Sequence, residues 1–282
     1  MHWGYAGVWP GDYLKLDKDP FWARLKFLQK YGLESTGTSF SALEKMHSAK
    51  REAVGQFLID NNIFLSPHGR PGDYFADTRD ELLRGVEKLL EQAEKWKDFC
   101  RSPLFVTVAG PYHRFMEAPS LDFQMERLRT VLTPLAAGLH SLDMNIGIEN
   151  HADYYVSDLA ALCQEVPHLG IFFDTGNCFL TGERPELAYE VGAPFTVGTH
   201  FKDHVVRPVP EARPLHFEVG PVALGAGHAN LELAYRIFAE KAPDPDRLVM
   251  EIELIPPSDV DTLETLDKSL AFIRSLGAPA EV

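Results

Sequence analysis

Residues 146–149 (Ile-Gly-Ile-Glu) and 171–174 (Ile-Phe-Phe-Asp) are short apolar runs that end on a carboxylate. Two later runs, residues 198–202 (Gly-Thr-His-Phe-Lys) and 249–253 (Val-Met-Glu-Ile-Glu), also combine apolar and ionisable residues. Short runs rich in aromatic and β-branched residues predict buried strands. Burying unpaired charges there is costly, and a shared cation removes that penalty. We therefore expect the four strand ends to meet at one site.

The same kind of run recurs along the chain and alternates with amphipathic stretches. Strands are predicted at residues 2–8, 33–38, 63–67, 104–109, 145–150, 170–174, 195–202 and 247–254. Helices are predicted at residues 19–31, 41–62, 77–101, 121–142, 156–166, 184–190, 230–241 and 259–276. Strands that alternate with helices predict a parallel sheet with helical crossovers. The count of each is that of a closed (β/α)₈ TIM barrel.

Nothing in the sequence divides the chain, so residues 1–282 are predicted to form a single barrel domain. An open doubly wound sheet is the alternative, but it usually has a glycine fingerprint after its first strand. Residues 8–13 (Val-Trp-Pro-Gly-Asp-Tyr) do not match that fingerprint. Residues 203–229, which include four prolines, are predicted to form a long loop after the seventh strand. On a barrel this loop lies on the face that carries active sites.

The composition limits the class of protein. The chain is 45% hydrophobic and 24% charged, which is typical of a soluble globular protein. Its three cysteines have no paired spacing, and no secretory signal precedes the first strand, so we expect a cytoplasmic protein. No apolar run is long enough to span a membrane. The net charge of −14 disfavours nucleic acid as a partner.

The ionisable residues of these strands predict a metal site. Three carboxylates, those of Glu149, Asp174 and Glu251, accompany the imidazole of His200. Oxygen ligands with a single His suit one divalent ion, with Mn²⁺ expected and Mg²⁺, Co²⁺ or Zn²⁺ as alternatives. Glu253 shares a strand face with Glu251 and competes with it for the fourth ligand position. Four ligands on an octahedral ion leave two positions for substrate oxygens, which suits a sugar.

Several runs in the second half of the chain resemble those of a known family. They are Gly147-Ile-Glu-Asn-His151, Phe173-Asp-Thr-Gly-Asn177, Thr199-His-Phe-Lys-Asp203, Leu224-Gly-Ala-Gly227 and Met250-Glu-Ile-Glu253. These runs are similar to those of the xylose-isomerase-like TIM-barrel superfamily. That superfamily includes sugar isomerases, ketose 3-epimerases, inosose dehydratases, AP endonucleases and C-glycoside-cleaving enzymes.

The resemblance implies a metal-dependent sugar or polyol isomerase or epimerase. It makes Glu149, Asp174, His200 and Glu251 the metal ligands. It also gives Glu149 and Glu251 the catalytic role of moving protons on opposite faces of the carbon beside a carbonyl, through an enediolate. A small-molecule sugar is the expected partner, and a homo-oligomer is compatible with the resemblance.

One departure from the resemblance keeps a second reaction open. Ketose epimerases of the family have a His three residues after the Asp ligand, where this chain has Asn177, which does not titrate near neutrality. A metal-dependent lyase, such as a keto-inositol dehydratase or an enzyme that cleaves 3-keto-glycosides or C-glycosides, is therefore the alternative. A non-catalytic sugar-binding barrel is a further alternative. An AP endonuclease is disfavoured, because the additional metal-binding His residues are absent.

Further polar residues follow the predicted strands and are candidates for substrate contact. Lys202 shares a strand face with His200 and is predicted to be catalytic by binding a substrate oxygen, although it could instead balance Glu149 and Glu251. His68 and His113 follow the third and fourth strands, and His151 follows the fifth. These three histidines and Asn177 are the predicted substrate-binding residues. A satisfied core or surface histidine is the alternative for each imidazole.

Overall fold

The structure is a computed structural model of the chain. It describes residues 1–282 except 75–77, 101–102, 109–111, 212–213, 258 and 277–282. In this part of the chain, no helix has the length and apolar character needed to cross a membrane.

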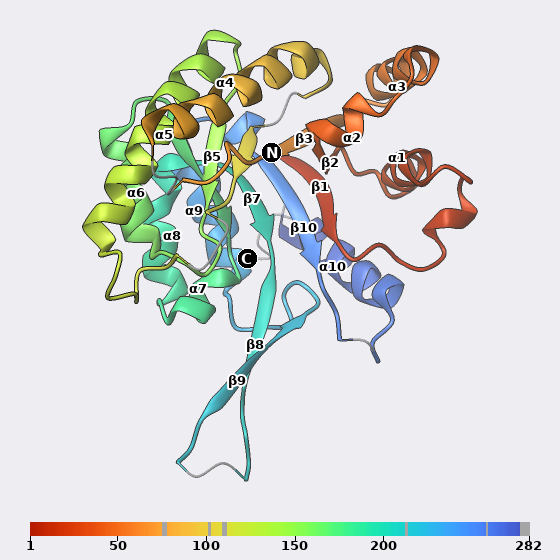
Figure 1. Cartoon of the computed structure of the whole chain (residues 1–282). Coiled ribbons are helices and arrows are strands. Elements are labelled where there is room, and N and C mark those ends of the chain that lie inside the picture. Colours follow the sequence, from red (N-terminus) through yellow and green to blue (C-terminus); the bar gives the residue numbers. More distant parts are fainter. Residues whose placement is uncertain (75–77, 101–102, 109–111, 212–213, 258, 277–282) are drawn as a thin grey trace.

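Eight parallel strands close into a barrel at the centre of the molecule (Figure 1). Around the barrel they follow the order β1-β10-β7-β6-β5-β4-β3-β2. Their bounds are β1 His2–Gly7, β2 Ser35–Ser39, β3 Phe64–Gly69, β4 Leu104–Val106, β5 Ile146–Glu149, β6 Leu169–Asp174, β7 Thr196–Phe201 and β10 Val249–Leu254. Each coincides with a predicted strand to within a few residues. The prediction of a (β/α)₈ TIM barrel is therefore confirmed.

Helices connect successive strands and cover the outside of the barrel (Figure 1). The α-helices are α1 Pro20–Tyr31, α2 Phe40–Glu44, α3 Ser48–Asp60, α4 Arg79–Trp96, α5 Leu121–Ser141, α6 Val156–Glu165, α7 Asn177–Thr181, α8 Pro185–Gly192, α9 Leu231–Lys241 and α10 Thr262–Leu276. Short 3₁₀ turns lie at η1 Tyr13–Lys15, η2 Lys97–Phe99, η3 Ala193–Phe195 and η4 Pro245–Arg247.

Two features of the helical layer differ from the prediction. The helix predicted over residues 41–62 is two helices, because His47 caps a new one by accepting a hydrogen bond from Lys50 N. The short helix α7 begins directly after β6 and was not predicted. It matters for the site, because it follows the carboxylate of Asp174.

Apolar side chains fill the space between strands and helices. On α4 the residues Leu82, Val86, Leu89 and Ala93 are all buried, as their three- and four-residue spacing predicts. Between β-strands and helices, Phe173, Tyr189 and Phe238 pack ring against ring. This packing holds the strands rigid, so that residues at their carboxyl ends have fixed positions.

The segment predicted to be a structureless loop contains a β-hairpin, so that part of the prediction is wrong. Strands β8 Asp203–Pro208 and β9 Phe217–Val222 pair antiparallel and extend away from the barrel (Figure 1). The prolines that led to the loop prediction are compatible with a two-stranded ribbon, because each strand has a free edge. Residues 223–229 then return to the barrel beside the first residues of β8.

Candidate metal and sugar site

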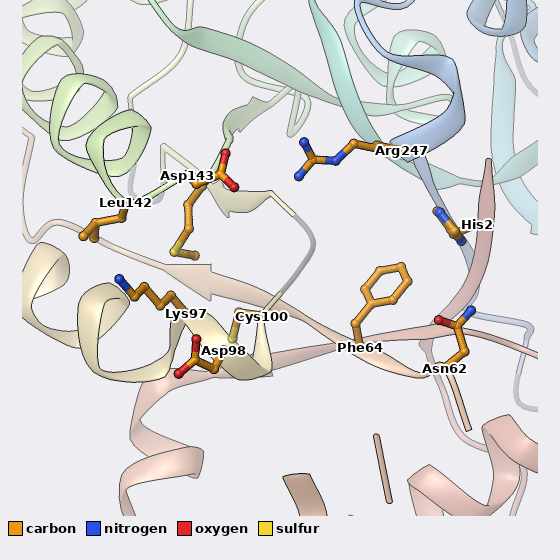
Figure 2. Close-up of a pocket in the computed structure, with 10 residues that line it drawn as sticks. His2, Asn62, Phe64, Lys97, Asp98, Cys100, Leu142, Asp143 and Arg247 are labelled. Atoms are coloured by element: carbon orange, nitrogen blue, oxygen red, sulfur yellow. The ribbon is translucent and has the colours of Figure 1, made fainter. Parts of the chain in front are cut away.

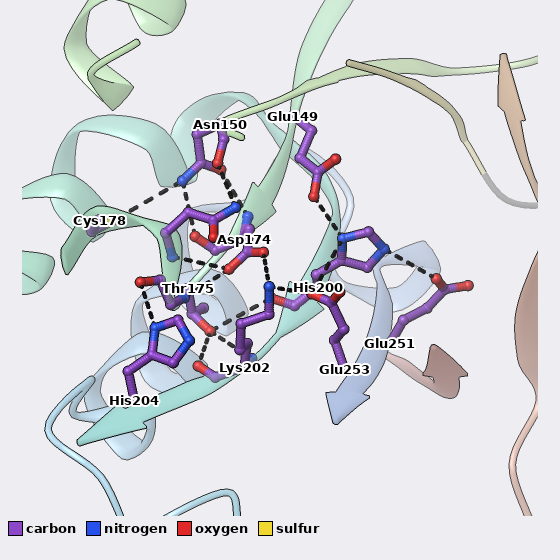
Figure 3. A network of polar contacts seen from close by, with 12 residues as sticks. Glu149, Asn150, Asp174, Thr175, Cys178, His200, Lys202, His204, Glu251 and Glu253 are labelled. Carbon is purple, nitrogen blue, oxygen red and sulfur yellow. Dashed lines mark hydrogen bonds and ion pairs between the residues drawn. The ribbon is translucent and has the colours of Figure 1, made fainter. Parts of the chain in front are cut away.

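The site lies at the carboxyl ends of β5, β6, β7 and β10, as predicted (Figure 3). Asp174 on β6 is in register with His200 on β7, and His200 is in register with Glu251 on β10. Glu149 is the last residue of β5, one strand further along. Neighbouring parallel strands therefore place these four side chains at one end of the barrel, where barrel enzymes have their active sites.

Glu149, Asp174 and His200 form a cluster that is able to hold a metal ion. One ligand atom of each lies within 4.8 Å of those of the other two, and all three residues are buried. Nδ1 of His200 is 2.7 Å from Oε1 of Glu149. Burial opposes protonation of His200, but its attraction to Glu149 and its hydrogen bonds to carboxylates outweigh burial and raise its pKa well above the ordinary value.

Glu251 lies on the other side of the His200 ring (Figure 3). Its Oε1 accepts a hydrogen bond of 2.9 Å from the hydroxyl of Ser35, and its Oε2 is 3.6 Å from Nε2 of His200. Among the residues that the structure describes, no group hydrogen-bonds to this buried Oε2. A buried carboxylate oxygen without a partner is costly, and a cation beside it removes the cost. Oε2 of Glu253 also has no hydrogen bond, but it is ion-paired with Lys202 at 2.6 Å, whereas the cationic group paired with Oε2 of Glu251 is His200 at 3.6 Å.

Glu253 pairs instead with Lys202. The Lys202 ammonium lies 2.6 Å from Oε2 of Glu253 and 2.8 Å from Oδ2 of Asp174. Burial disfavours the charged lysine, but the two carboxylates outweigh burial and raise the pKa of Lys202. Lys202 therefore balances Asp174 and Glu253, rather than Glu149 and Glu251.

A network of amides fixes Asp174. The side-chain amide of Asn150 accepts a hydrogen bond from Asp174 N and donates one to Asp174 O, at 2.7 and 2.9 Å. Oδ1 of Asp174 accepts from the backbone N–H groups of Gly176 and Asn177 at the start of α7. Burial raises the pKa of Asp174, and the Lys202 charge partly offsets this effect. Oδ2 of Asp174 instead accepts a hydrogen bond from Lys202.

Asn177, predicted to bind substrate, has a different contact in the structure. Its side chain is buried and donates a hydrogen bond of 2.9 Å to the backbone oxygen of Asn150. It therefore belongs to the support of Asp174. Asn150 was not predicted to have a role of its own, although its place directly after Glu149 is the signal that would have indicated one.

A cavity of about 560 Å³ opens onto this end of the barrel. Its lining combines residues of the acidic cluster with predicted substrate-binding residues: Glu149, His200, Lys202, Glu253, His68 and His151, with Ser39, Gly69, Arg70, Phe105 and Thr107. Desolvation is the main reason that the pKa of His68 is lowered, so its imidazole is neutral at neutral pH. The rings of Phe105 and Phe172 pack edge-on against His200 and limit its rotation.

His113 is not among the described residues that line this cavity. Its Nδ1 accepts a hydrogen bond from Phe115 N, and its backbone oxygen accepts one from Gln124. The ring of His113 packs against that of Phe115.

Asp203 is a buried residue whose role was not predicted. Its carboxylate accepts hydrogen bonds from the backbone N–H groups of Gly225, Gly227 and Ala229. A Cβ on Gly227 would lie 2.2 Å from Oδ1 of Asp203, so this approach requires glycine. Gly225, at φ +79°, also adopts a backbone conformation that favours glycine. The glycine-rich run 224–227 therefore closes the loop beside β7.

The family model for xylose isomerase-like TIM barrels matches residues 25–276. The chain belongs to this family. A search of curated protein sequences finds no match. The prediction of the superfamily from the runs in the second half of the chain is confirmed.

Solved structures of the family share the fold at low sequence identity. A D-psicose 3-epimerase with D-tagatose from Clostridium cellulolyticum is 12% identical, with a TM-score of 0.67 and 98% of each chain covered. A 3-keto-D-glucoside 4-epimerase from E. coli is 13% identical, with a TM-score of 0.64 over 98% of this chain and 99% of that one. A xylose isomerase-like TIM barrel protein from Mycobacterium smegmatis in complex with magnesium is 16% identical, with a TM-score of 0.63 over 90% and 86%.

A second cavity, of about 540 Å³, lies at the opposite end of the barrel (Figure 2). It is lined by residues at or before the starts of the strands, among them His2, Phe64, Cys100, Met144 and Arg247. In barrel enzymes this end contributes to stability rather than to catalysis. The cluster of Glu149, Asp174, His200 and Glu251 lies at the other end, together with the cavity that His68 and His151 line, so we place the candidate functional site there.

Proposed function

We propose that this protein is a divalent-metal-dependent sugar or polyol isomerase or epimerase that removes a proton beside a carbonyl. The observation that carries the proposal is the position of two buried carboxylates on either side of the His200 ring. Glu149 lies at Nδ1 and Glu251 at Nε2 of this ring. Two bases on opposite sides of one substrate are what epimerisation requires, since a proton leaves one face of a carbon and returns to the other.

The chemistry of the donor set fits a hard divalent cation. Glu149, Asp174 and His200 would hold it, with Glu251 as the fourth ligand, because the buried Oε2 of Glu251 accepts no hydrogen bond from the described residues and lies 3.6 Å from Nε2 of His200. We propose Mn²⁺, with Mg²⁺, Co²⁺ and Zn²⁺ as alternatives. When bound, such an ion stabilises the negative charge that develops on a carbonyl oxygen as the neighbouring proton leaves.

The remaining roles follow from the lining of the cavity. Glu149 and Lys202 line the cavity, and Glu251 lies behind His200. We assign the proton exchange to Glu149 and Glu251, and a hydrogen bond to a substrate oxygen to Lys202. Neutral His68 is suited to bind hydroxyl groups, because a neutral imidazole both donates and accepts, and His151 lines the same cavity. Phe105 presents a ring beside them, which suits the apolar face of a sugar.

Hydrogen exchange tests the proposal. The protein is incubated with Mn²⁺ and a panel of ketoses and keto-glycosides in D₂O, and deuterium is followed by NMR at the carbon beside the carbonyl. We expect exchange without elimination, and we expect Glu251→Gln to abolish it while the far-UV circular dichroism spectrum stays unchanged. A panel that shows no exchange with any divalent ion would refute the proposal.

A lyase is the second candidate, and the position of Asn177 favours it. In this chain no titratable group stands where ketose epimerases of the family have a His, and Asn177 is tied to the backbone of Asn150. In a lyase the same proton removal expels a leaving group from the next carbon. The D₂O experiment separates the two reactions, because a lyase gives an unsaturated or released product.

Two other classes are distinguished by simple assays. A non-catalytic sugar-binding barrel would keep its biological function in the Glu149→Gln variant, whereas an enzyme would lose it. We propose that the partner is a small-molecule sugar and not nucleic acid, so we expect no cleavage of abasic DNA at low salt.

A further inference from the structure

The Lys202 ammonium lies against the one oxygen of Asp174 that is free to bind a metal. Oδ1 of Asp174 is used by two backbone N–H groups at the start of α7. Oδ2 is the remaining oxygen, and Lys202 Nζ is 2.8 Å from it. Because Oδ1 already accepts two hydrogen bonds, we expect a cation held by Glu149, Asp174 and His200 to bind Oδ2. Lys202 and a metal ion therefore compete for Asp174.

Glu253 gives Lys202 a second contact that does not depend on Asp174. Lys202 Nζ is 2.6 Å from Oε2 of Glu253, and both side chains line the cavity. Asp174 is fully buried, whereas the side chain of Glu253 is 15% exposed. An ammonium that leaves Asp174 can thus stay paired, on the side of the site that faces the cavity.

The carboxylates of the site need positive charge beside them whether or not a metal ion is bound. Four carboxylates, those of Glu149, Asp174, Glu251 and Glu253, form ion pairs with two cationic side chains, His200 and Lys202. An uncompensated carboxylate in this environment is strongly destabilising. A divalent ion a few ångströms from an ammonium is also unfavourable, since like charges repel strongly where little water screens them.

We propose that Lys202 is a positioning residue that takes the place of the metal at Asp174 and passes to Glu253 when the metal binds. This inference rests on the metal site of the proposed function. Lys202 already lines the cavity, and the movement frees its ammonium from Asp174 only when the ion is present. Metal binding thus makes the Lys202 ammonium available to donate a hydrogen bond to a substrate oxygen. Metal and substrate therefore bind cooperatively.

Metal affinity tests the competition without reference to activity. Mn²⁺ is titrated by isothermal calorimetry into metal-free wild type, into Lys202→Met and into the control Lys241→Met, which removes an exposed lysine paired with Glu190. We expect Lys202→Met to bind Mn²⁺ at least about tenfold more tightly than wild type, because both the competitor and the repulsion are gone. The control should bind like wild type.

Each other outcome overturns a defined part of the account. If wild type binds Mn²⁺ and Lys202→Met binds it equally or more weakly, the competition is refuted while the proposed function stands. If wild type binds no divalent ion, both fail.

A crystal structure of wild type with Mg²⁺ tests the movement directly, and it serves even if the Lys202→Met variant does not fold. We expect Nζ of Lys202 beyond hydrogen-bond distance from Asp174 and still paired with Glu253. Persistence of the 2.8 Å contact to Asp174 beside a bound ion would refute the inference.

Discussion

Replacing Asp153 with Asn should remove a pH-dependent loss of stability. The Asp153 side chain is buried, and its Oδ2 has no hydrogen-bond partner among the residues that the structure describes. Oδ1 accepts a single backbone hydrogen bond, from Tyr154 N. Burial raises the pKa of Asp153 from 3.8 to about 6, against a smaller opposing effect of the hydrogen bond.

The sign and size of the effect follow from this pKa. Between pH 4 and pH 6 the folded protein binds more protons at this group than the unfolded chain, so the free energy of unfolding falls as pH rises. The rise from 3.8 to about 6 corresponds to at most roughly 3 kcal/mol, and we expect about 2 kcal/mol over the accessible range. Asp153→Asn keeps the shape and the acceptor for Tyr154 N but cannot ionise.

Urea denaturation of wild type and variant from pH 4.5 to pH 7.5 measures the effect. The difference in the free energy of unfolding, Asp153→Asn minus wild type, should increase by about 2 kcal/mol across this range. The exposed Asp267→Asn is the control for the loss of one negative charge. A difference that stays constant with pH would show that Asp153 is not perturbed, and the reasoning from burial would be refuted.

Three further substitutions test separate parts of the site. Glu251→Gln should lower the rate of D₂O exchange by about 10²-fold or more with the fold retained, since it removes one of two bases; an unchanged rate would contradict the role. Asn150→Ala should lower the free energy of unfolding, measured with urea, by roughly 2 kcal/mol, because the backbone N–H and C=O of Asp174 both lose their hydrogen bonds to Asn150. It should also weaken Mn²⁺ binding about tenfold or more. An unchanged Mn²⁺ affinity would refute the role of Asn150 in holding Asp174. Asp203→Ala should lower the free energy of unfolding by roughly 3 kcal/mol. Asp203→Asn should lower it less, because the amide oxygen still accepts a hydrogen bond from Gly225 N. Equal losses in urea denaturation would contradict the role of Asp203 as a hydrogen-bond acceptor for the glycine-rich loop.

The fold was predictable because it depends on a pattern that each segment carries locally. A run such as residues 169–174 is apolar on both faces, as a buried parallel strand must be, and a stripe such as that of α4 identifies the helix that covers it. The hairpin β8–β9 has neither signal. Apart from the buried Asp203 and His204, its residues are partly buried or exposed, so its sequence shows neither an apolar run nor an apolar stripe.

The principal ionisable residues of the site were also predictable, since register brings strand ends together once the barrel is known. The residues that hold these groups in place were not predictable, because their hydrogen bonds depend on the direction in which each side chain points. Asn150 and Asn177 turn their amides to the backbone, and Asp203 reaches a glycine-rich loop more than twenty residues later.

The number of metal ions that bind per chain tests the central claim most directly. Electron paramagnetic resonance counts free Mn²⁺ as it is titrated into metal-free wild type and into Asp174→Asn. If the carboxylates and the imidazole share one cation, wild type should bind one Mn²⁺ per chain tightly, and Asp174→Asn should lose this site. Wild type that leaves all Mn²⁺ free in solution, or a variant that binds as tightly as wild type, would contradict the claim.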